Sequence, residues 1–289
     1  MILWQNDNTV VIGRNQNPWS ECSSSLLEEE GVRLARRYSG GGAVYHDMGN
    51  LNFSFICSEE DYNQEKQFQV ILQACKRCGI DAYLSGRNDI LVDGRKFSGN
   101  AFIHQSGFSC HHGTIMVNSE FGKLSRYLTP SKAKLQAKGV RSVRSRVANL
   151  SEFCPNLNVA AMKVNLIAAF TDVYGLPAEK VVLSDADEQK IHQLEQALED
   201  PNWVYGAHPP ISCTIDGRFP WGGITLYLGL ENGYIQQLNV YTDSLDWTLA
   251  AAIQQALHNC PFNKDAILSA LKNAVSPEIL SDIASILDI

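Results

Sequence analysis

Three consecutive glycines, Gly40, Gly41 and Gly42, constrain the fold of this chain more than any other feature. Glycine lacks a Cβ and readily takes a positive φ, so such a run predicts a turn at which the backbone can approach a ligand closely. N–H groups on such a turn can line an anion. Arg36 and Arg37, just upstream, carry permanently charged groups that suit phosphate or carboxylate. A tight turn with solvated arginines would also explain these residues, and the segment matches neither a Walker loop nor GxGxxG.

The first 200 residues predict an alternation of strands and helices. Helical spacing indicates helices over residues 22–30, 63–78, 157–174 and 188–198. Short runs rich in β-branched and aromatic residues indicate strands at 33–36, 51–57, 82–84, 89–92, 96–103 and 110–117, after two short strands near the start. Asp93-Gly94 predicts a hairpin between two of these strands.

A domain boundary is expected between Asp200 and Pro210, a segment with three prolines and no periodicity. Downstream, strands are predicted at 211–216, 223–229 and 234–242, and helices at 249–257, 264–274 and 277–287. The fold class is therefore α/β of the α+β type. We expect a large mixed-sheet domain over residues 1–200 and a small α/β accessory domain over residues 206–289.

Composition excludes several classes of protein. A formal net charge of −7 without a basic stripe argues against a nucleic-acid binder. The sequence contains no run of about 18 apolar residues, so no membrane span is predicted. The N-terminus lacks the pattern of a signal peptide. Eight scattered cysteines suit a reducing compartment, so a cytoplasmic protein is expected. The CxxC formed by Cys75 and Cys78 lies in a helical stretch and is interpreted as part of a buried helix face.

Two further segments carry residues suited to chemistry. Asn88 and Asp89 offer oxygen ligands of the kind that hold Mg²⁺ beside phosphates, although turn residues alone explain them. Lys96 follows a tight turn on a strand, where it can neutralise a carboxylate and a phosphoryl group under attack, or simply face solvent. His111 and His112 are adjacent on a predicted strand, so they point to opposite faces and are poorly placed to ligate one metal ion together.

Seven segments stand in an order that is far more specific than any one of them. They are TVVIGRNQNPWSEC, VRLARRYSGGGAVYHDMGNLNFSF, SGRNDILVDGRKFSGNA, HHGT, KGVRSVRSRVANL, FPWGGITLYL and VYTDSL. With them the chain resembles the lipoate–protein ligase family in its two-domain bacterial form, over nearly its whole length. The resemblance implies a catalytic domain of the biotin and lipoate ligase type followed by the accessory domain.

The resemblance also implies roles for individual residues. Lys96 would be catalytic and would contact both the lipoate carboxyl group and the α-phosphate. The nucleotide or adenylate would be bound by Arg37, Gly42, Ala43, Val44, Tyr45 and Lys96. Lipoate would be bound by Lys96, Ser39, Gly41, His46, His111 and His112. Asp89 and Asn88 would lie near Mg²⁺, and the basic loop of residues 134–146 would cover the adenylate.

The implied reaction joins lipoate to protein in two steps. Lipoate and Mg-ATP would give lipoyl-AMP and pyrophosphate, and the lipoyl group would then pass to a lysine of an acceptor. The implied acceptors are the lipoyl domains of 2-oxoacid dehydrogenase complexes and the H protein of glycine cleavage. The implied small-molecule partners are lipoate and ATP. We expect a monomer that binds neither nucleic acid nor membrane.

The sequence also leaves room for functions other than an ATP-dependent ligase. An acyltransferase of the same fold would take an octanoyl or lipoyl group without ATP and could use Cys110 as its nucleophile. A transferase that uses preformed lipoyl-AMP and a biotin ligase are two more possible functions. Family members usually begin with another strand and helix ahead of Ile2, so we expect this form to be less stable and less active than a longer one. For the same reason, the chain could be an inactive lipoate-binding module.

Overall fold

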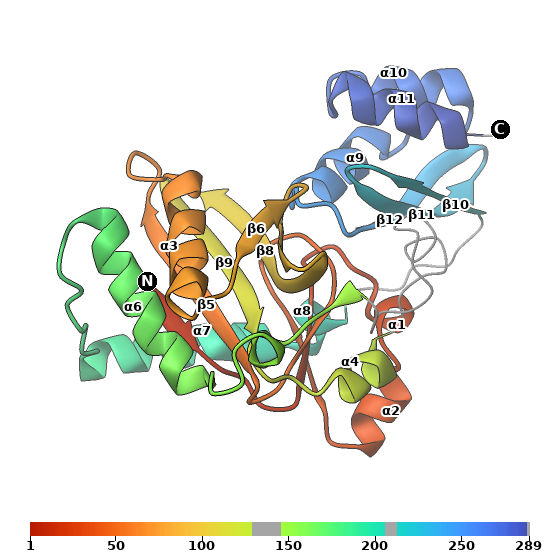
Figure 1. The fold of residues 1–289 in the computed structure, drawn as a ribbon. Helices are drawn as coiled ribbons and strands as arrows, with labels where there is room; N and C mark the ends of the chain where they lie inside the picture. The colour runs from red at the N-terminus through yellow and green to blue at the C-terminus, as the bar shows by residue number, and fades with distance from the viewer. Residues whose placement is uncertain (129–145, 206–212, 288–289) are drawn as a thin grey trace. The chain divides into compact units, whose positions relative to one another are not determined.

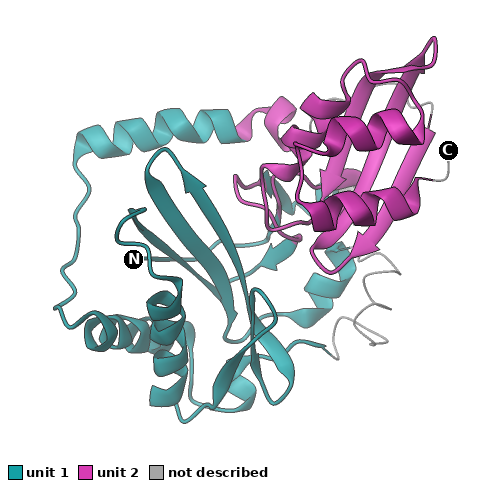
Figure 2. Ribbon diagram, turned by 90° about the horizontal axis from the view of Figure 1, so that it is seen from above, with its two compact units in different colours: residues 1–11, 22–35, 44–198 teal, residues 12–21, 36–43, 199–289 magenta. Residues whose placement is uncertain are grey.

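The computed structural model describes residues 1–128, 146–205 and 213–287. It forms two compact units, each with its own hydrophobic core (Figure 2). The first unit comprises residues 1–11, 22–35 and 44–198, and the second comprises residues 12–21, 36–43 and 199–289. No helix in the described part of the chain is long and apolar enough to cross a membrane.

A six-stranded sheet with the order β1-β5-β9-β8-β7-β6 forms the centre of the first unit (Figure 1). Neighbouring strands pair antiparallel. The strands are β1 (Ile2–Trp4), β5 (Asn50–Ser58), β6 (Ala82–Ser85), β7 (Asp89–Val92), β8 (Arg95–Gln105) and β9 (Phe108–Met116). A parallel bridge between Lys96 and Val147 adds a further link to this sheet.

The two faces of the sheet differ in character because side chains alternate along each strand. Leu51, Phe53 and Phe55 of β5 belong to the core, which they share with helices α3 (Gln64–Arg77) and α6 (Val159–Tyr174) (Figure 1). Both helices begin at an asparagine N-cap, whose side chain accepts a hydrogen bond from a backbone N–H of the first turn. Side chains that point the other way along β5 include the polar residues Asn50, Asn52 and Ser54, followed by the exposed Ile56.

Smaller elements surround the sheet. A second sheet has the order β3-β2-β4, with β2 (Thr9–Ile12), β3 (Arg33–Arg36) and β4 (Val44–His46). Helix α2 (Ser24–Glu29) lies within the first predicted helix, whereas helix α4 (Phe121–Tyr127) and the 3₁₀ turn η2 (Leu150–Glu152) were not predicted from the sequence. Helix α7 (Asp185–Glu199) buries no residue.

The C-terminal part of the second unit is a three-stranded antiparallel sheet covered by helices. Strands β10 (Cys213–Phe219), β11 (Gly222–Glu231) and β12 (Tyr234–Thr242) form a meander, and Asn232 and Gly233 take positive φ in the hairpin turn. Helices α9 (Leu249–Leu257), α10 (Lys264–Leu271) and α11 (Pro277–Ile286) share its core. The short helices α1 (Pro18–Glu21) and α8 (Pro201–Val204) complete the unit. The expected α+β class is confirmed.

Candidate active site

Lys96 and Asp89 meet on the polar face of the six-stranded sheet. The β7–β8 hairpin turns at Asp93 and Gly94, both with positive φ, as predicted. A bulge between Ile90 and Leu91 shifts the strand register. The Nζ atom of Lys96 lies 2.6 Å from Oδ1 of Asp89, and both side chains remain partly exposed. The sheet thus presents an ammonium group held in place by a carboxylate.

Gly99 makes room for the side chain of Lys96. Gly99 pairs with Asp89 across the two strands, and a Cβ at this position would lie 2.8 Å from Nζ of Lys96. That is closer than side chains pack, so the lysine can lie across the strand only because residue 99 has no side chain. The N–H of Gly99 donates to Oγ1 of Thr114 at 3.3 Å, which ties this position to β9.

Asn88 and Asn100 clamp the turn before Asp89. Nδ2 of Asn88 donates to the carbonyl of Asn100 at 2.8 Å, while the backbone N–H and Nδ2 of Asn100 both donate to the carbonyl of Asn88 at 3.0 Å. Asn88 therefore uses its amide to shape the turn. Mg²⁺ in nucleotide sites is usually held by one or two carboxylates plus the phosphates. The partly exposed carboxylate of Asp89 fits such an ion, and no cluster of three His, Cys, Asp or Glu exists among the described residues.

The paired histidines point to opposite faces, as alternation predicted. His111 is 0% exposed and lies among the rings of Phe53, Phe68 and Phe102 on the core face. Its ring nitrogens face Gln67 and Asn100, and burial lowers its pKa to about 3. The direct lipoate contact expected for His111 therefore does not fit this geometry, because the ring is sealed in the core.

His112 lies on the polar face. It pairs across the strands with Ser54 of β5 and Ala101 of β8, and it is partly exposed. It therefore shares a face with Thr114 and the Lys96–Asp89 pair. Its expected contact with lipoate is compatible with this position and stays a prediction.

Arg36 belongs to the framework of the second unit. Its guanidinium donates to five backbone carbonyl oxygens, those of Gly13, Arg14, Gln16, Trp203 and Val204. The side chain is buried, and burial lowers its pKa to about 10, so it stays charged at neutral pH. The N–H donors of Arg36 are therefore engaged by backbone carbonyls. The phosphate or carboxylate binding that the sequence suggested for Arg36 does not fit this arrangement.

Arg37 organises the glycine turn itself. Its Nη2 atom donates to the carbonyls of Gly40 and Gly42 at 2.7 and 2.8 Å, and its Nε atom donates to Oγ of Ser39 at 3.1 Å. Burial lowers the pKa of Arg37 to about 10, so the charge persists at neutral pH. By holding two carbonyls of the turn, Arg37 sets how the peptide groups between them are oriented.

The glycines of the turn are required by close backbone contacts. A Cβ on Gly40 would lie 2.3 Å from the carbonyl oxygen of Ser244, and one on Gly13 would lie 2.1 Å from the carbonyl oxygen of Gly41. Gly41 takes a φ of 90° and donates its N–H to the carbonyl of Ser244. No role for Gly13 was predicted from the sequence, although it stands in one of the seven segments that carry the family resemblance.

The other predicted residues flank this turn. Ser39 is 2% exposed, and Ala43 is half-buried. Val44 and Tyr45 lie in β4 and pair with Val11 and Val10, with the Tyr45 hydroxyl donating to Asn8. His46 is 3% exposed, with Nδ1 3.2 Å from Nδ2 of Asn6. Roles for Val44 and Tyr45 in nucleotide binding would therefore rest on backbone groups.

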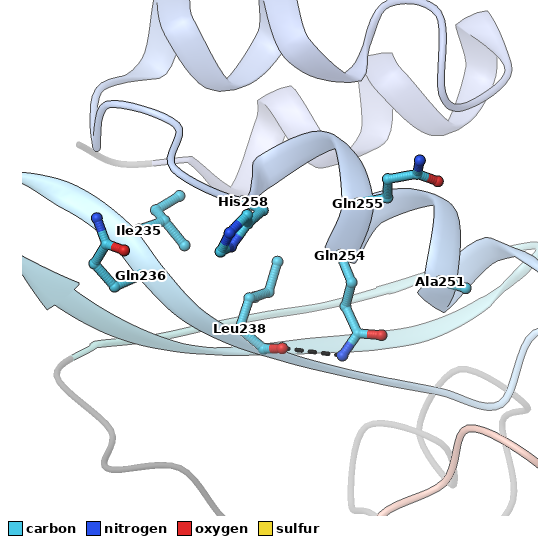
Figure 3. A pocket seen from close by; sticks show the side chains of 7 residues that line it. All are labelled: Ile235, Gln236, Leu238, Ala251, Gln254, Gln255 and His258. Atoms are coloured by element: carbon cyan, nitrogen blue, oxygen red, sulfur yellow. Dashed lines mark hydrogen bonds between the residues drawn. The ribbon is translucent and has the colours of Figure 1, made fainter.

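One predicted part of the site lies almost wholly outside the described residues, and two pockets of the structure lie away from the predicted site residues. The predicted adenylate loop of residues 134–146 lies outside the described residues except for Arg146. A pocket of about 540 Å³ between β12 and α9 is lined by apolar residues, glutamines and His258 (Figure 3). A second one, of about 790 Å³, lies between α3 and β6. Neither is lined by a predicted site residue.

The thiol of Cys110 is protonated, and its neighbour His111 is not placed to act as its base. Burial raises the pKa of its thiol to about 11, so it stays protonated at neutral pH. The ring of its neighbour His111 points into the core, where its two nitrogens hydrogen-bond to Gln67 and Asn100. The thiol therefore has no general base in His111.

Two family models cover most of the chain. The lipoyl protein ligase A/B catalytic domain matches residues 1–171, and the bacterial lipoate protein ligase C-terminus matches residues 208–286. Lipoate-protein ligase A of Psychrobacter cryohalolentis is 40% identical over 293 residues, covering 98% of this chain and 86% of that protein. Lipoate-protein ligase A of Blochmanniella pennsylvanica is 40% identical over 280 residues, covering 94% and 83%.

Solved structures agree with these matches. P. falciparum LipL1 in complex with lipoate superimposes with a TM-score of 0.84 at 33% identity, covering 98% of this chain and 84% of that one. A lipoate-protein ligase A bound with ATP gives a TM-score of 0.63 at 26% identity, covering 71% and 84%. By sequence along nearly its whole length and by fold, the chain belongs to the lipoate–protein ligase family.

Proposed function

We propose that this enzyme activates lipoate with Mg-ATP and transfers the resulting lipoyl group to the lysine of an acceptor lipoyl domain. The observation that carries the proposal is the Lys96–Asp89 pair, 2.6 Å apart on the polar sheet face, within a chain of this family. Relatives have been solved with lipoate and with ATP. A further relative, from Thermoplasma acidophilum, is a bipartite lipoate protein ligase described together with its E2 lipoyl domain.

Activation requires two anions to meet. A carboxylate oxygen of lipoate forms a bond to the α-phosphorus while the bond from phosphorus to the pyrophosphate oxygen breaks, and pyrophosphate leaves with the electron pair. The ammonium of Lys96 offsets the repulsion between carboxylate and phosphate and orients both groups. Mg²⁺, carried by the phosphates and held by Asp89 with Asn88 beside it, would supply further positive charge to the leaving group.

Nucleotide binding is assigned to Arg37 and to the backbone of residues 42–45. Arg37 stays charged at neutral pH and holds the carbonyls of Gly40 and Gly42, which supports a preorganised turn. Lipoate binding is assigned to the polar sheet face with His112, together with Ser39, Gly41 and His46. His111 is left out of this set because its ring lies on the opposite, core face of the sheet, against Phe53, Phe68 and Phe102.

Transfer uses the mixed anhydride lipoyl-AMP. The neutral amine of an acceptor lysine attacks the carbonyl carbon, the bond to the AMP oxygen breaks, and the amine loses a proton. No covalent bond to the enzyme is needed, which agrees with the protonated thiol of Cys110. The proposed acceptors are lipoyl domains of 2-oxoacid dehydrogenase complexes and the glycine cleavage H protein, and the proposed setting is the cytoplasm.

Mass spectrometry of an apo lipoyl domain incubated with enzyme, ATP, Mg²⁺ and lipoate tests the proposal. We expect one lipoyl adduct on the acceptor lysine and one pyrophosphate released for each adduct formed. Lys96→Ala should abolish pyrophosphate release. Lys123→Ala is the matched control, since Lys123 forms an exposed pair with Glu120. Transfer without ATP, or full activity of Lys96→Ala, would contradict the proposal.

A further inference from the structure

A chain of hydrogen-bonded polar side chains crosses the sheet from helix α3 to the turn that carries Asp89. It begins with Gln67 on α3, whose Oε1 position lies 3.1 Å from Nδ1 of His111. Nε2 of His111 lies 2.8 Å from Oδ1 of Asn100, and Nδ2 of Asn100 lies 3.0 Å from the carbonyl of Asn88. Gln67, His111 and Asn100 are at most 4% exposed, so water does not compete for these bonds.

The direction of each hydrogen bond follows from the carbonyl of Asn88. A carbonyl oxygen only accepts, so Asn100 must turn Nδ2 toward it and Oδ1 toward the ring of His111. The ring must then donate from Nε2. With its pKa lowered to about 3 by burial, the ring is neutral at neutral pH and carries a single proton. Nδ1 is therefore an acceptor. Its donor is Nε2 of Gln67, once the side-chain amide of Gln67 is turned so that Nε2 and not Oε1 faces the ring.

The other end of this chain of hydrogen bonds lies beside Asp89 and Lys96. Asn88 directly precedes Asp89, and Asn100 directly follows Gly99, over which Lys96 lies. Three hydrogen bonds join Asn88 to Asn100. The orientation of the Asn100 amide therefore sets the geometry of the turn on both sides of the Lys96–Asp89 pair.

We infer that His111 is a positioning residue for adenylation, whose Nε2–H fixes the Asn100 amide and through it the turn that presents Asp89 and Lys96. This inference rests on the proposed function. Groups that align reacting atoms depend on the residues behind them, and a displacement of about 1 Å can cost about 100-fold in rate. His111 exerts its effect without touching substrate.

His111→Phe removes the ring N–H while keeping an aromatic ring among the surrounding phenylalanines. We expect kcat for lipoate-dependent pyrophosphate release to fall about 10-fold to 100-fold, with a smaller change in the KM for ATP. His111→Gln, whose amide nitrogen can reach Asn100, should restore most of the rate. Ser109→Ala is the matched control, because Ser109 is buried on the same strand and face, and its hydroxyl bonds to His104 at the far end of the hairpin. It should leave kcat within about twofold of wild type.

A double-mutant cycle separates positioning from general loosening of the core. If His111 acts through Asn100, the effects of His111→Phe and Asn100→Ala on kcat will be strongly non-additive, whereas His111→Phe and Ser109→Ala will combine additively. Additive effects in the first pair, or a kcat for His111→Phe equal to that of Ser109→Ala, would overturn the inference. An inactive wild-type enzyme would instead count against the proposed function.

Folding of the phenylalanine variant is checked by its melting temperature. Should it not fold, His111→Gln and His111→Asn still test the inference, since only the longer amide reaches Asn100. The glutamine variant should then be the more active of the two by at least about 10-fold. Equal kcat values for these two variants would refute the positioning role.

Discussion

Replacing Gly99 with alanine should reduce activity without reducing stability. The added Cβ would lie 2.8 Å from Nζ and 3.0 Å from Cε of Lys96, where an ordinary contact begins at 3.4 Å. The ammonium must therefore move by about 0.6 Å or more from the position in which it contacts Asp89 at 2.6 Å. Since the obstructing atoms are the end of a flexible side chain, the fold can adapt to the methyl group.

The magnitude follows from the role of Lys96. A displacement of this size in a group that aligns two anions should lower kcat for adenylate formation by about 10-fold to 100-fold. The φ of Gly99 lies outside the left-handed region, so alanine introduces no backbone strain there. Its lower chain entropy in the unfolded state should keep the free energy of unfolding within about 1 kcal/mol of wild type.

Pyrophosphate release with lipoate and ATP measures the first effect, and denaturant-induced unfolding measures the second. Gly122→Ala in α4 serves as control, because a Cβ there meets nothing within 4 Å and the residue has no positive φ. A Gly99→Ala enzyme with wild-type kcat would refute the reasoning. It would mean that the position of the ammonium over Gly99 is not the reactive one.

Buried groups lead to three more expected outcomes. Arg36→Lys should lower the free energy of unfolding by about 2–4 kcal/mol, because an ammonium cannot reach all five carbonyls that the guanidinium binds; denaturant titration showing a loss below about 0.5 kcal/mol would argue otherwise. The pKa of His111 is lowered to about 3 in the fold, so as the pH falls the unfolded chain binds a proton at His111 before the folded chain does. The contribution of His111 to stability is therefore complete above about pH 6.5 and declines as the pH falls toward 3. His111→Phe should therefore show a shallower loss of stability than wild type in unfolding curves between those values, and identical slopes would exclude this. Cys110→Ala should keep full lipoyl transfer because a thiol with a pKa raised to about 11 is not the nucleophile; loss of acyl transfer with retained folding would favour an acyltransferase that works through Cys110.

Much of the fold was predictable because its signals are local. The β7–β8 and β11–β12 hairpins follow from Asp93-Gly94 and Asn232-Gly233, whose residues take the positive φ that such turns need. Helices α3 and α6 follow from apolar spacing and end beside Gly79 and Gly175, as predicted. Short elements such as α4 and η2 were not predicted, because their few residues carry no periodic pattern.

Some parts of the site could also be predicted from local rules. Alternation along a strand predicted that His111 and His112 point to opposite faces, and they do. The family resemblance gave Lys96 and Asp89 separate roles, and their 2.6 Å contact was not predicted. The need for Gly99 was missed, although a glycine three residues beyond a strand lysine is a signal that could be sought.

The sequence by itself determined that this chain has glycine-rich turns, two hairpins at fixed positions and the ordered segments of the lipoate–protein ligase family. Only the tertiary structure decided which face of the sheet each histidine occupies and that Arg36 binds carbonyls while Arg37 holds the glycine turn. The physical reason is that turn propensity and side-chain period are set by neighbours along the chain. Burial and hydrogen-bond partners depend on residues that are distant in sequence, such as Trp203 for Arg36 and Gln67 for His111.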